Sequence, residues 1–199
     1  MIEYLYGKLD ALTPATATIE CHGVGYMLNI SLNTYSAIQG KDNVRLYVYE
    51  NIREDAWVLF GFATTQERAL FLQLISVSGV GGNTARTILS AYSPAELCDI
   101  ITNGDERMLK TVKGLGTKTS QRIIVELKDK VLSLAITPQP TEGAEATHTI
   151  NQQVYSDATE ALKALGYPPA PVAKVVKAVL KDEPDATVEI VIKKAFKML

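Results

Sequence analysis

The sequence of 199 residues contains little of what several protein classes require. It has only two cysteines, Cys21 and Cys98, which are too few for a disulfide scaffold and lack the spacing of a zinc site. No apolar run approaches the roughly 18 residues that a membrane-spanning helix needs. Residues 1–4 show no basic stretch followed by an apolar run, so we expect no secretory signal. These absences predict a soluble, reduced protein of the cytoplasm, with no membrane partner.

The fingerprints of nucleotide binding and of catalysis are missing as well. There is no Gly-x-x-x-x-Gly-Lys-Ser/Thr loop for ATP, and no Gly-x-Gly in the strand, turn and acid context of an NAD site. The sequence has no cluster of carboxylates for a catalytic metal and no lysine in a nucleotidyl-accepting context. We therefore expect no cofactor, no metal site and no catalytic residues.

Apolar residues, in contrast, make up 47% of the chain, which is enough for packed cores. The net charge of −2 is unevenly distributed. Residues 1–64 carry four Lys/Arg against seven Asp/Glu, residues 65–132 nine against seven, and residues 133–199 seven against eight. Within residues 107–130, seven Lys/Arg face two Asp/Glu. Such a basic window is either a solvated helix face or a site for a polyanion.

The first segment, residues 1–64, has the pattern of β-strands. Apolar and polar residues alternate with period two, and residues 22–25, His-Gly-Val-Gly, indicate a tight turn. About five short strands in this length are typical of a small barrel of the oligonucleotide-binding (OB) type. The clearest strand patterns cover residues 18–21, 26–30, 44–49 and 57–62.

The second segment, residues 65–132, has the helical period. Ser93, followed by Pro94 and Glu96, predicts a helix start with a capping box. The other predicted helices cover residues 66–77 and 83–91, a stretch from about 105 that breaks at Gly114, and residues 117–132. This segment is predicted to be all-α.

Residues 133–152 are rich in Pro, Thr, Gly and Glu and predict a flexible linker. Residues 153–199 then predict a small three-helix bundle. Its first helix is expected to open with a capping box at residues 157–160, and the others to cover residues 172–180 and 187–198.

A repeated unit in the second segment suggests the chemistry. Residues 76–88 align with residues 111–123, and each copy is a helix, a Gly-apolar-Gly turn and a second helix. The glycines permit a tight hairpin and expose backbone N–H groups at the start of the second helix, where an anion is favoured. The predicted phosphate-binding residues are Gly79, Val80, Gly81, Gly82, Asn83 and Thr84 in the first hairpin, and Lys113, Gly114, Leu115, Gly116, Thr117, Lys118, Thr119 and Arg122 in the second.

A single Gly-x-Gly turn would indicate no more than a helix cap. Two copies at a fixed spacing, with Lys113, Lys118 and Arg122 beside the second, favour phosphate binding. Contacts of this kind predict DNA binding that is independent of base sequence and sensitive to salt.

Together, these segments resemble the RuvA family, the Holliday-junction-binding subunits of bacterial branch-migration complexes. The resemblance covers essentially the whole chain and includes Gly-Val-Gly-Tyr at 23–26, Arg-Glu-Asp-Ala at 53–56, Leu-Phe-Gly-Phe at 59–62 and Ile-Val-Glu-Leu-Lys-Asp at 124–129. It implies an α+β multidomain fold with an OB barrel, a tandem helix-hairpin-helix domain and a UBA-like bundle. The chain departs from the common pattern at Gly82-Asn83, where relatives have Pro-Lys, and at Thr117, where a lysine is common.

The resemblance also implies function and partners. It implies a non-catalytic subunit that binds four-way junction DNA in recombination and repair, forms a homotetramer or an octamer of two face-to-face tetramers, and works with the hexameric ATPase RuvB and the resolvase RuvC. It assigns Glu54 and Asp55 as acidic pins near the junction centre, although a solvated turn is the simpler interpretation of these residues alone. It assigns motor binding to Leu162, Leu165, Tyr167 and Phe196.

Two other functions remain open from the sequence. The hairpins could hold the substrate of a small nuclease or ligase fragment, which would cleave or join strands in Mg²⁺. The barrel could instead bind single strands, which would then be preferred over four-way junctions.

Overall fold

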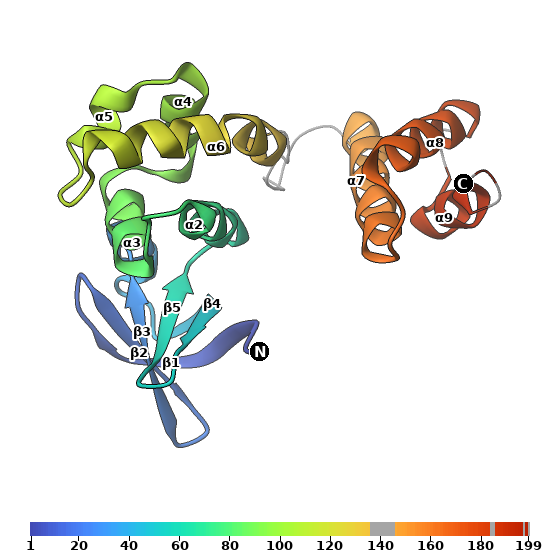
Figure 1. Ribbon diagram of the computed structural model, residues 1–199. Coiled ribbons are helices and arrows are strands. Elements are labelled where there is room, and N and C mark those ends of the chain that lie inside the picture. The colour runs from blue at the N-terminus through green and yellow to red at the C-terminus, as the bar shows by residue number, and fades with distance from the viewer. Residues whose placement is uncertain (136–145, 184–185, 197, 199) are drawn as a thin grey trace. The chain divides into compact units, whose positions relative to one another are not determined.

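The computed structural model describes residues 1–135, 146–183, 186–196 and 198, with the side chains of 132–135 and 146–153 left out. The chain forms two compact units, Met1–Pro138 and Gln139–Leu199 (Figure 1). The first unit contains a closed five-stranded barrel and a helical region, and the second contains a helical bundle. The predicted fold class is confirmed. No helix in the described part of the chain is both long and apolar enough to cross a membrane.

The barrel closes in the strand order β1-β2-β3-β5-β4, in which β3 and β5 are parallel and the other pairs antiparallel. His22 and Gly23 have positive φ angles of 51° and 86° and form the tight turn between β2 and β3 that the sequence predicted. Alternate residues of each strand point inward, as in Leu28 and Leu46, and build the barrel core. The strands are β1 (Tyr4–Leu12), β2 (Thr16–Cys21), β3 (Val24–Ile30), β4 (Asn43–Ile52) and β5 (Trp57–Phe62).

A short helix between β3 and β4, α1 (Leu32–Ile38), was not expected from the sequence. Its N-cap is Ser31, whose hydroxyl accepts a hydrogen bond from the N–H of Thr34 at 3.0 Å. Seven residues give too short a window for the helical period to be visible.

The helical region contains five helices. The pair α5 and α6 repeats the pair α2 and α3, and α4 lies between the two pairs along the chain. Ser93 caps α4, and its hydroxyl and N–H group form the predicted capping box with Glu96. The helices are α2 (Thr65–Ser76), α3 (Gly82–Ala91), α4 (Pro94–Asn103), α5 (Glu106–Lys110) and α6 (Thr117–Ala135).

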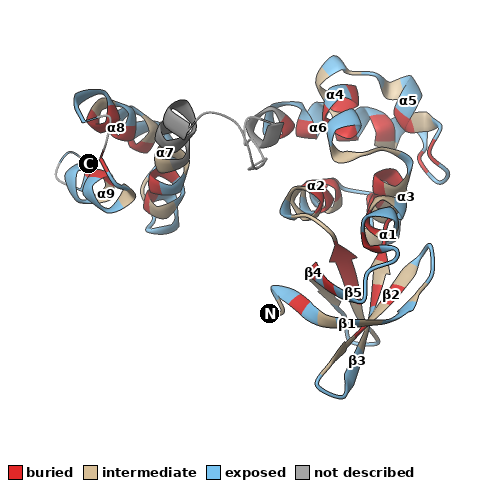
Figure 2. Cartoon of the chain, turned by 180° about the vertical axis from the view of Figure 1, so that it is seen from behind, coloured by how far each residue is buried: buried red, intermediate tan, exposed pale blue. Residues whose placement is uncertain are grey.

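In addition to its own core, the barrel shares a second hydrophobic core with the helical region, visible as buried residues at the junction of β5 and α2 in Figure 2. Phe60 and Phe62 of β5 pack on Phe71 of α2, with ring centroids 5.0 and 4.8 Å apart. This core fixes the barrel against the helices, so the first unit can hold a site built from both.

The C-terminal unit consists of α7 (Ala146–Ala164), α8 (Pro169–Asp182) and α9 (Val188–Ala195) around its own core. The helix start predicted at residues 157–160 is wrong, because these residues lie inside α7. The same Asp-x-x-Glu spacing occurs in the middle of a helix, where it places two side chains on the solvent-facing side. Asp157 and Glu160 are exposed in this way.

The linker predicted at 133–152 is wrong at both ends, which lie in helices. Helix α6 continues through Ala135 and α7 already begins at Ala146, while residues 136–145 lie outside the described residues.

Candidate nucleic-acid interface

The two hairpins have the same backbone geometry, residue for residue. Gly79 and Gly114 both have a φ of +91°, which an L side chain rarely adopts. One residue later, the N–H of Val80 donates to the carbonyl of Val77 at 3.0 Å, and the N–H of Leu115 donates to that of Val112 at 3.1 Å. The repeat seen in the sequence is therefore a repeat in structure.

Two of the predicted phosphate-binding residues have a different role. The side chains of Val80 and Leu115 are 6% and 7% exposed and pack into the shared core. Since their N–H groups are bonded within the turn, they offer no donor to a phosphate. These two residues hold the hairpins in shape.

Free donors lie at the starts of α3 and α6. Ala85 and Ser120 make the first intrahelical bonds, to the carbonyls of Gly81 at 2.9 Å and Gly116 at 3.0 Å. The N–H groups before them, at 82–84 and 117–119, have no acceptor within their helices. Gly81 forms no side-chain cap, and a Cβ added at Gly81 or Gly116 would meet no described atom within 4 Å. An anion can therefore approach both helix ends closely.

The lysines of the second hairpin add positive charge. Lys113 and Lys118 are exposed, and in the described part of the chain neither lies within ion-pair distance of a carboxylate. Lys110, one turn before the hairpin, is instead paired with Glu106 at 2.8 Å. This contact lowers the pKa of the Glu106 carboxyl, together with a hydrogen bond from Gln121.

Arg122 connects the two hairpins. Its guanidinium donates to the carbonyl of Ser78 in the first hairpin at 3.2 Å, and its Nε lies 3.7 Å from Glu126. Arg122 is half exposed, so it positions one hairpin against the other and still presents charge at the surface. The contact with Ser78 joins segments far apart in the sequence, and no local pattern predicted it.

The first hairpin lacks a cation of its own, and the structure gives the reason for its unusual residues. A Cβ on Gly82 would lie 2.6 Å from the ring of Phe60, so a larger residue here requires the ring or the start of α3 to shift. Arg86, on the following turn, donates to the carbonyl of Ala15 in the β1–β2 loop at 3.0 Å. The first hairpin therefore offers backbone donors and the polar side chains of Asn83 and Thr84. No local sequence pattern indicated the Phe60 and Ala15 contacts.

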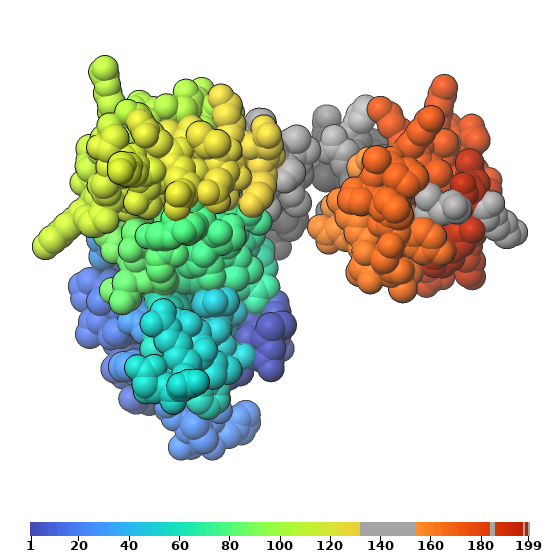
Figure 3. Space-filling model, viewed as in Figure 1, coloured from blue at the N-terminus to red at the C-terminus, as the bar shows by residue number. Residues whose placement is uncertain are grey.

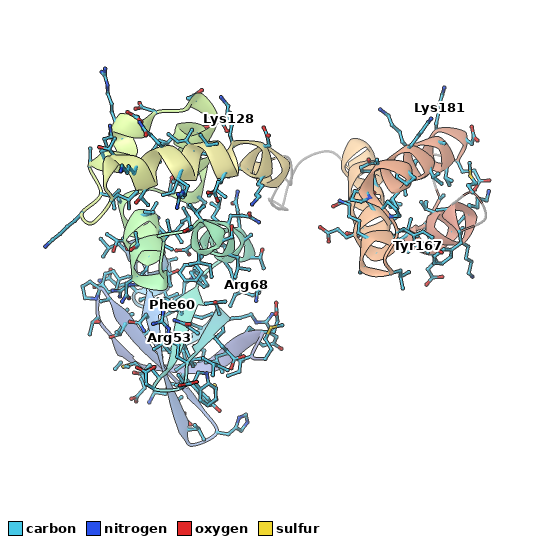
Figure 4. The ribbon with its side chains drawn as sticks, viewed as in Figure 1. Arg53, Phe60, Arg68, Lys128, Tyr167 and Lys181 are labelled. Atoms are coloured by element: carbon cyan, nitrogen blue, oxygen red, sulfur yellow. The ribbon has the colours of Figure 1, made fainter. Side chains whose placement is uncertain are left out.

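Glu54 and Asp55 are exposed at the tip of the β4–β5 hairpin, where the sequence indicated a turn. The N–H of the neighbouring Arg53 donates to the carbonyl of Ala56 at 2.8 Å and closes the turn. Arg53 is labelled on the barrel in Figure 4, and the tip belongs to the cyan surface in Figure 3. No group of three His, Cys, Asp or Glu side chains with the arrangement of a metal site occurs among the described residues.

In the C-terminal unit, one predicted contact residue is wrong. Leu162 is fully buried in the core of the bundle and cannot contact a partner. Leu165 and Phe196 are 62% and 44% exposed, and the ring of Tyr167 lies 5.7 Å from that of Phe196. The resemblance grouped Leu162 with Leu165, but Leu162 packs inside the bundle, whereas α7 ends at Ala164 and leaves Leu165 in the exposed turn beyond it.

Comparisons with known proteins cover the whole chain. Residues 1–61 match the family model described as RuvA N terminal domain, residues 71–129 the SAM-like helix-hairpin-helix tandem, and residues 153–199 the RuvA C-terminal domain. The chain is 58% identical to a Bacteroides fragilis protein over 201 residues, and 58% identical to one of Bacteroides thetaiotaomicron over 204. It is 47% identical to a Porphyromonas gingivalis protein over 204 residues. Each alignment spans 100% of both chains, and each relative is named as the Holliday junction branch migration complex subunit RuvA.

Proposed function

The chain belongs to the RuvA family, and on this premise we propose that it binds four-way DNA junctions by their structure and prepares them for branch migration. The observation that carries this proposal is the pair of equivalent hairpins, each with free N–H groups at a helix start. Phosphates are the natural ligands of such groups, and phosphate contacts do not read base sequence. Lys113, Lys118 and Arg122 add a salt-dependent attraction at the second hairpin.

Preference for a junction over plain duplex requires a feature that lowers the affinity for duplex. Glu54 and Asp55 supply it in this proposal. Exposed carboxylates repel the phosphates of a continuous duplex lying across the tip, but they tolerate a junction centre where the four strands separate. The tip therefore lowers the affinity for the wrong structure more than for the right one.

We further propose that four copies of the chain bind the four arms of the junction, as a tetramer or as two tetramers on opposite faces. The chain itself performs no catalysis in this scheme, and a hexameric ATPase of the RuvB kind supplies the energy. The proposed contact with that motor consists of the exposed Leu165 and Phe196 and the half-buried Tyr167 of the C-terminal unit. A resolvase of the RuvC kind would act on the same junction, in the cytoplasm where bacterial DNA lies.

A gel-shift series tests the proposal with an immobile four-way junction, a duplex arm and a single strand of matched sequence. We expect the junction to bind most tightly. Preference for the single strand would favour a single-strand-binding barrel, and cleavage of labelled junction by the protein alone in Mg²⁺ would favour a nuclease.

The same series tests the acidic tip. The double variant Glu54→Gln with Asp55→Asn should bind duplex more tightly and lose part of its preference for the junction. The matched control is Asp42→Asn, which neutralises an exposed carboxylate elsewhere in the barrel and should change neither affinity. If the double variant matches the wild type on both DNAs, the tip is an ordinary solvated turn.

A further inference from the structure

The tip of the β4–β5 hairpin carries two large apolar side chains beside its carboxylates. Ile52 and Trp57 are directly opposite one another in the β4–β5 ladder, so their side chains lie on the same face of the hairpin. They are 67% and 63% exposed. Trp57 makes no ring contact with another aromatic residue in the described part of the chain.

This face of the hairpin is the one that builds the barrel core further along. Side chains alternate between the two faces of a strand, so Ile52 shares a face with Val48, and Trp57 shares one with Leu59. Val48 and Leu59 are buried at 4% and 8% exposure. Between them and the tip, Glu50 accepts a hydrogen bond from the N–H of Ile2 at 2.7 Å. The barrel core therefore ends at Glu50, and the hairpin continues past it with its apolar face uncovered.

The charges around this face restrict what can cover it. Glu54 and Asp55 stand in the turn between the two strands, and Arg53 is the one basic residue among the four turn residues 53–56. A DNA phosphate is repelled by the two carboxylates, whereas an uncharged planar base is not. The indole of Trp57 offers a base a stacking surface, and Ile52 offers an apolar edge beside it. The tip is thus matched to a base whose own phosphate is held away.

We propose that Trp57 stacks on a DNA base at the crossover of the junction, with Ile52 packed beside it. The proposal rests on the function proposed above, because only a junction brings bases without a continuous stacking partner to the tip. In an intact duplex each base is stacked on both sides and its edges alone are accessible. The carboxylates and the indole then act together: the former keep the backbone apart and the latter stabilises the base that is left behind.

Trp57 is the only tryptophan of the chain, so its fluorescence reports on this one position. The full-length wild-type protein is titrated with the immobile four-way junction and, separately, with a duplex arm of the same sequence. Binding is followed in parallel by the anisotropy of a dye on the DNA. We expect the junction to quench the indole emission in step with binding, and the duplex to bind without quenching it.

Variants provide a second, independent readout. Trp57→Ala should lower junction affinity about tenfold, the loss of one base–aromatic stack, and leave duplex affinity unchanged. Trp57→Phe keeps an aromatic ring and should retain most of the affinity. The matched control is Val24→Ala, which shortens an exposed apolar side chain at the β2–β3 hairpin and should have no effect on either DNA.

The outcomes separate this inference from the proposed function. If anisotropy reports tight junction binding while Trp57 emission and Trp57→Ala affinity stay unchanged, the stacking proposal is overturned and junction binding stands. If anisotropy reports no preference for the junction, the proposed function fails, and the stacking proposal fails with it. Emission that shifts to the blue with rising protein concentration and then ignores DNA would show that a second copy of the chain covers the patch, which also overturns the proposal.

Discussion

Lys118 and Lys110 both belong to the basic window of the sequence, but the structure separates them. Lys110 is neutralised by Glu106, whereas Lys118 stands unpaired at the start of α6. Lys118→Ala should therefore weaken junction binding equally for all base sequences, and flatten the slope of log affinity against log salt by about one unit for each subunit bound. Binding titrations at several salt concentrations measure both quantities.

Lys110→Ala is the matched control, since it removes a lysine from the same window without removing a free charge. Its salt slope should stay at the wild-type value. Equal slopes for Lys118→Ala and the wild type would remove Lys118 from the interface.

Glu67 is a buried residue for which pH dependence can be predicted. Its carboxylate accepts hydrogen bonds from the hydroxyls of Ser31 and Thr34, the latter at 2.7 Å, yet burial raises its pKa above the ordinary value of 4.5. The folded state therefore holds this proton more tightly than the unfolded state. The stability that the group contributes is complete below pH 4.5 and is lost as the pH rises through the raised pKa.

Glu67→Gln should consequently gain stability relative to the wild type as the pH rises above 4.5 through the raised pKa of Glu67, as measured by urea denaturation. Glu96→Gln provides a comparison of opposite sign, because hydrogen bonds from Ser93 lower the pKa of Glu96. That variant should lose stability relative to the wild type as the pH rises from the lowered pKa of Glu96 to 4.5, and the difference should stay constant above 4.5. A gap between Glu67→Gln and wild type that does not change with pH would contradict the argument.

At the scale of the element, the first hairpin depends on the space left by one glycine. Gly82→Ala should destabilise the protein by about 1–3 kcal/mol, because its Cβ would collide with the ring of Phe60. Gly81→Ala, one residue earlier, meets open space and should cost less than about 1 kcal/mol. Chemical denaturation of both variants makes the comparison.

The cause can be tested with a second change at Phe60. In a Phe60→Leu background, the additional cost of Gly82→Ala should shrink, since the two side chains no longer compete for one space. An unchanged cost would mean that the glycine is needed for a reason other than this contact.

The bundle offers a matched pair of leucines three residues apart. Leu162→Ala opens a cavity in the core and should cost the C-terminal unit about 2–5 kcal/mol. Leu165→Ala should change stability by less than about 0.5 kcal/mol, since the side chain is exposed, but reduce stimulation of a RuvB-type motor. Branch-migration assays beside thermal unfolding distinguish the two effects. Full stimulation by a well-folded Leu165→Ala protein would remove Leu165 from the contact.

A feature could be predicted from the sequence when the residues that determine it lie close together in the chain. Four of the five strands, the duplicated hairpins and the Ser93 capping box are encoded within a few residues and were predicted, whereas β1 (Tyr4–Leu12) was not located. The burial of Leu162 depends on how α7 packs against α8 and α9, and the interior position of Asp157 depends on where α7 begins, so neither is a local signal. The Gly82–Phe60 and Arg122–Ser78 contacts join distant segments, so no local pattern could contain them.

For the whole molecule, the division into two units makes a direct prediction. A protein ending at Pro138 should bind the junction about as tightly as the full chain, because both hairpins and the acidic tip lie in the first unit. It should fail to stimulate the motor. Gel shifts and branch-migration assays on the shortened protein check both statements, and loss of junction binding would mean that part of the DNA site lies beyond residue 138.

The ring contacts between β5 and α2 mean that the barrel and the helical region of the first unit cannot be separated without exposing buried residues. Cutting the chain after residue 64 would leave Phe60 and Phe62 without Phe71, and would expose buried aromatic surface to water. An excised barrel would therefore aggregate. The C-terminal unit has a core separate from those of the first unit, so it could be exchanged for another domain without rebuilding the DNA-binding part.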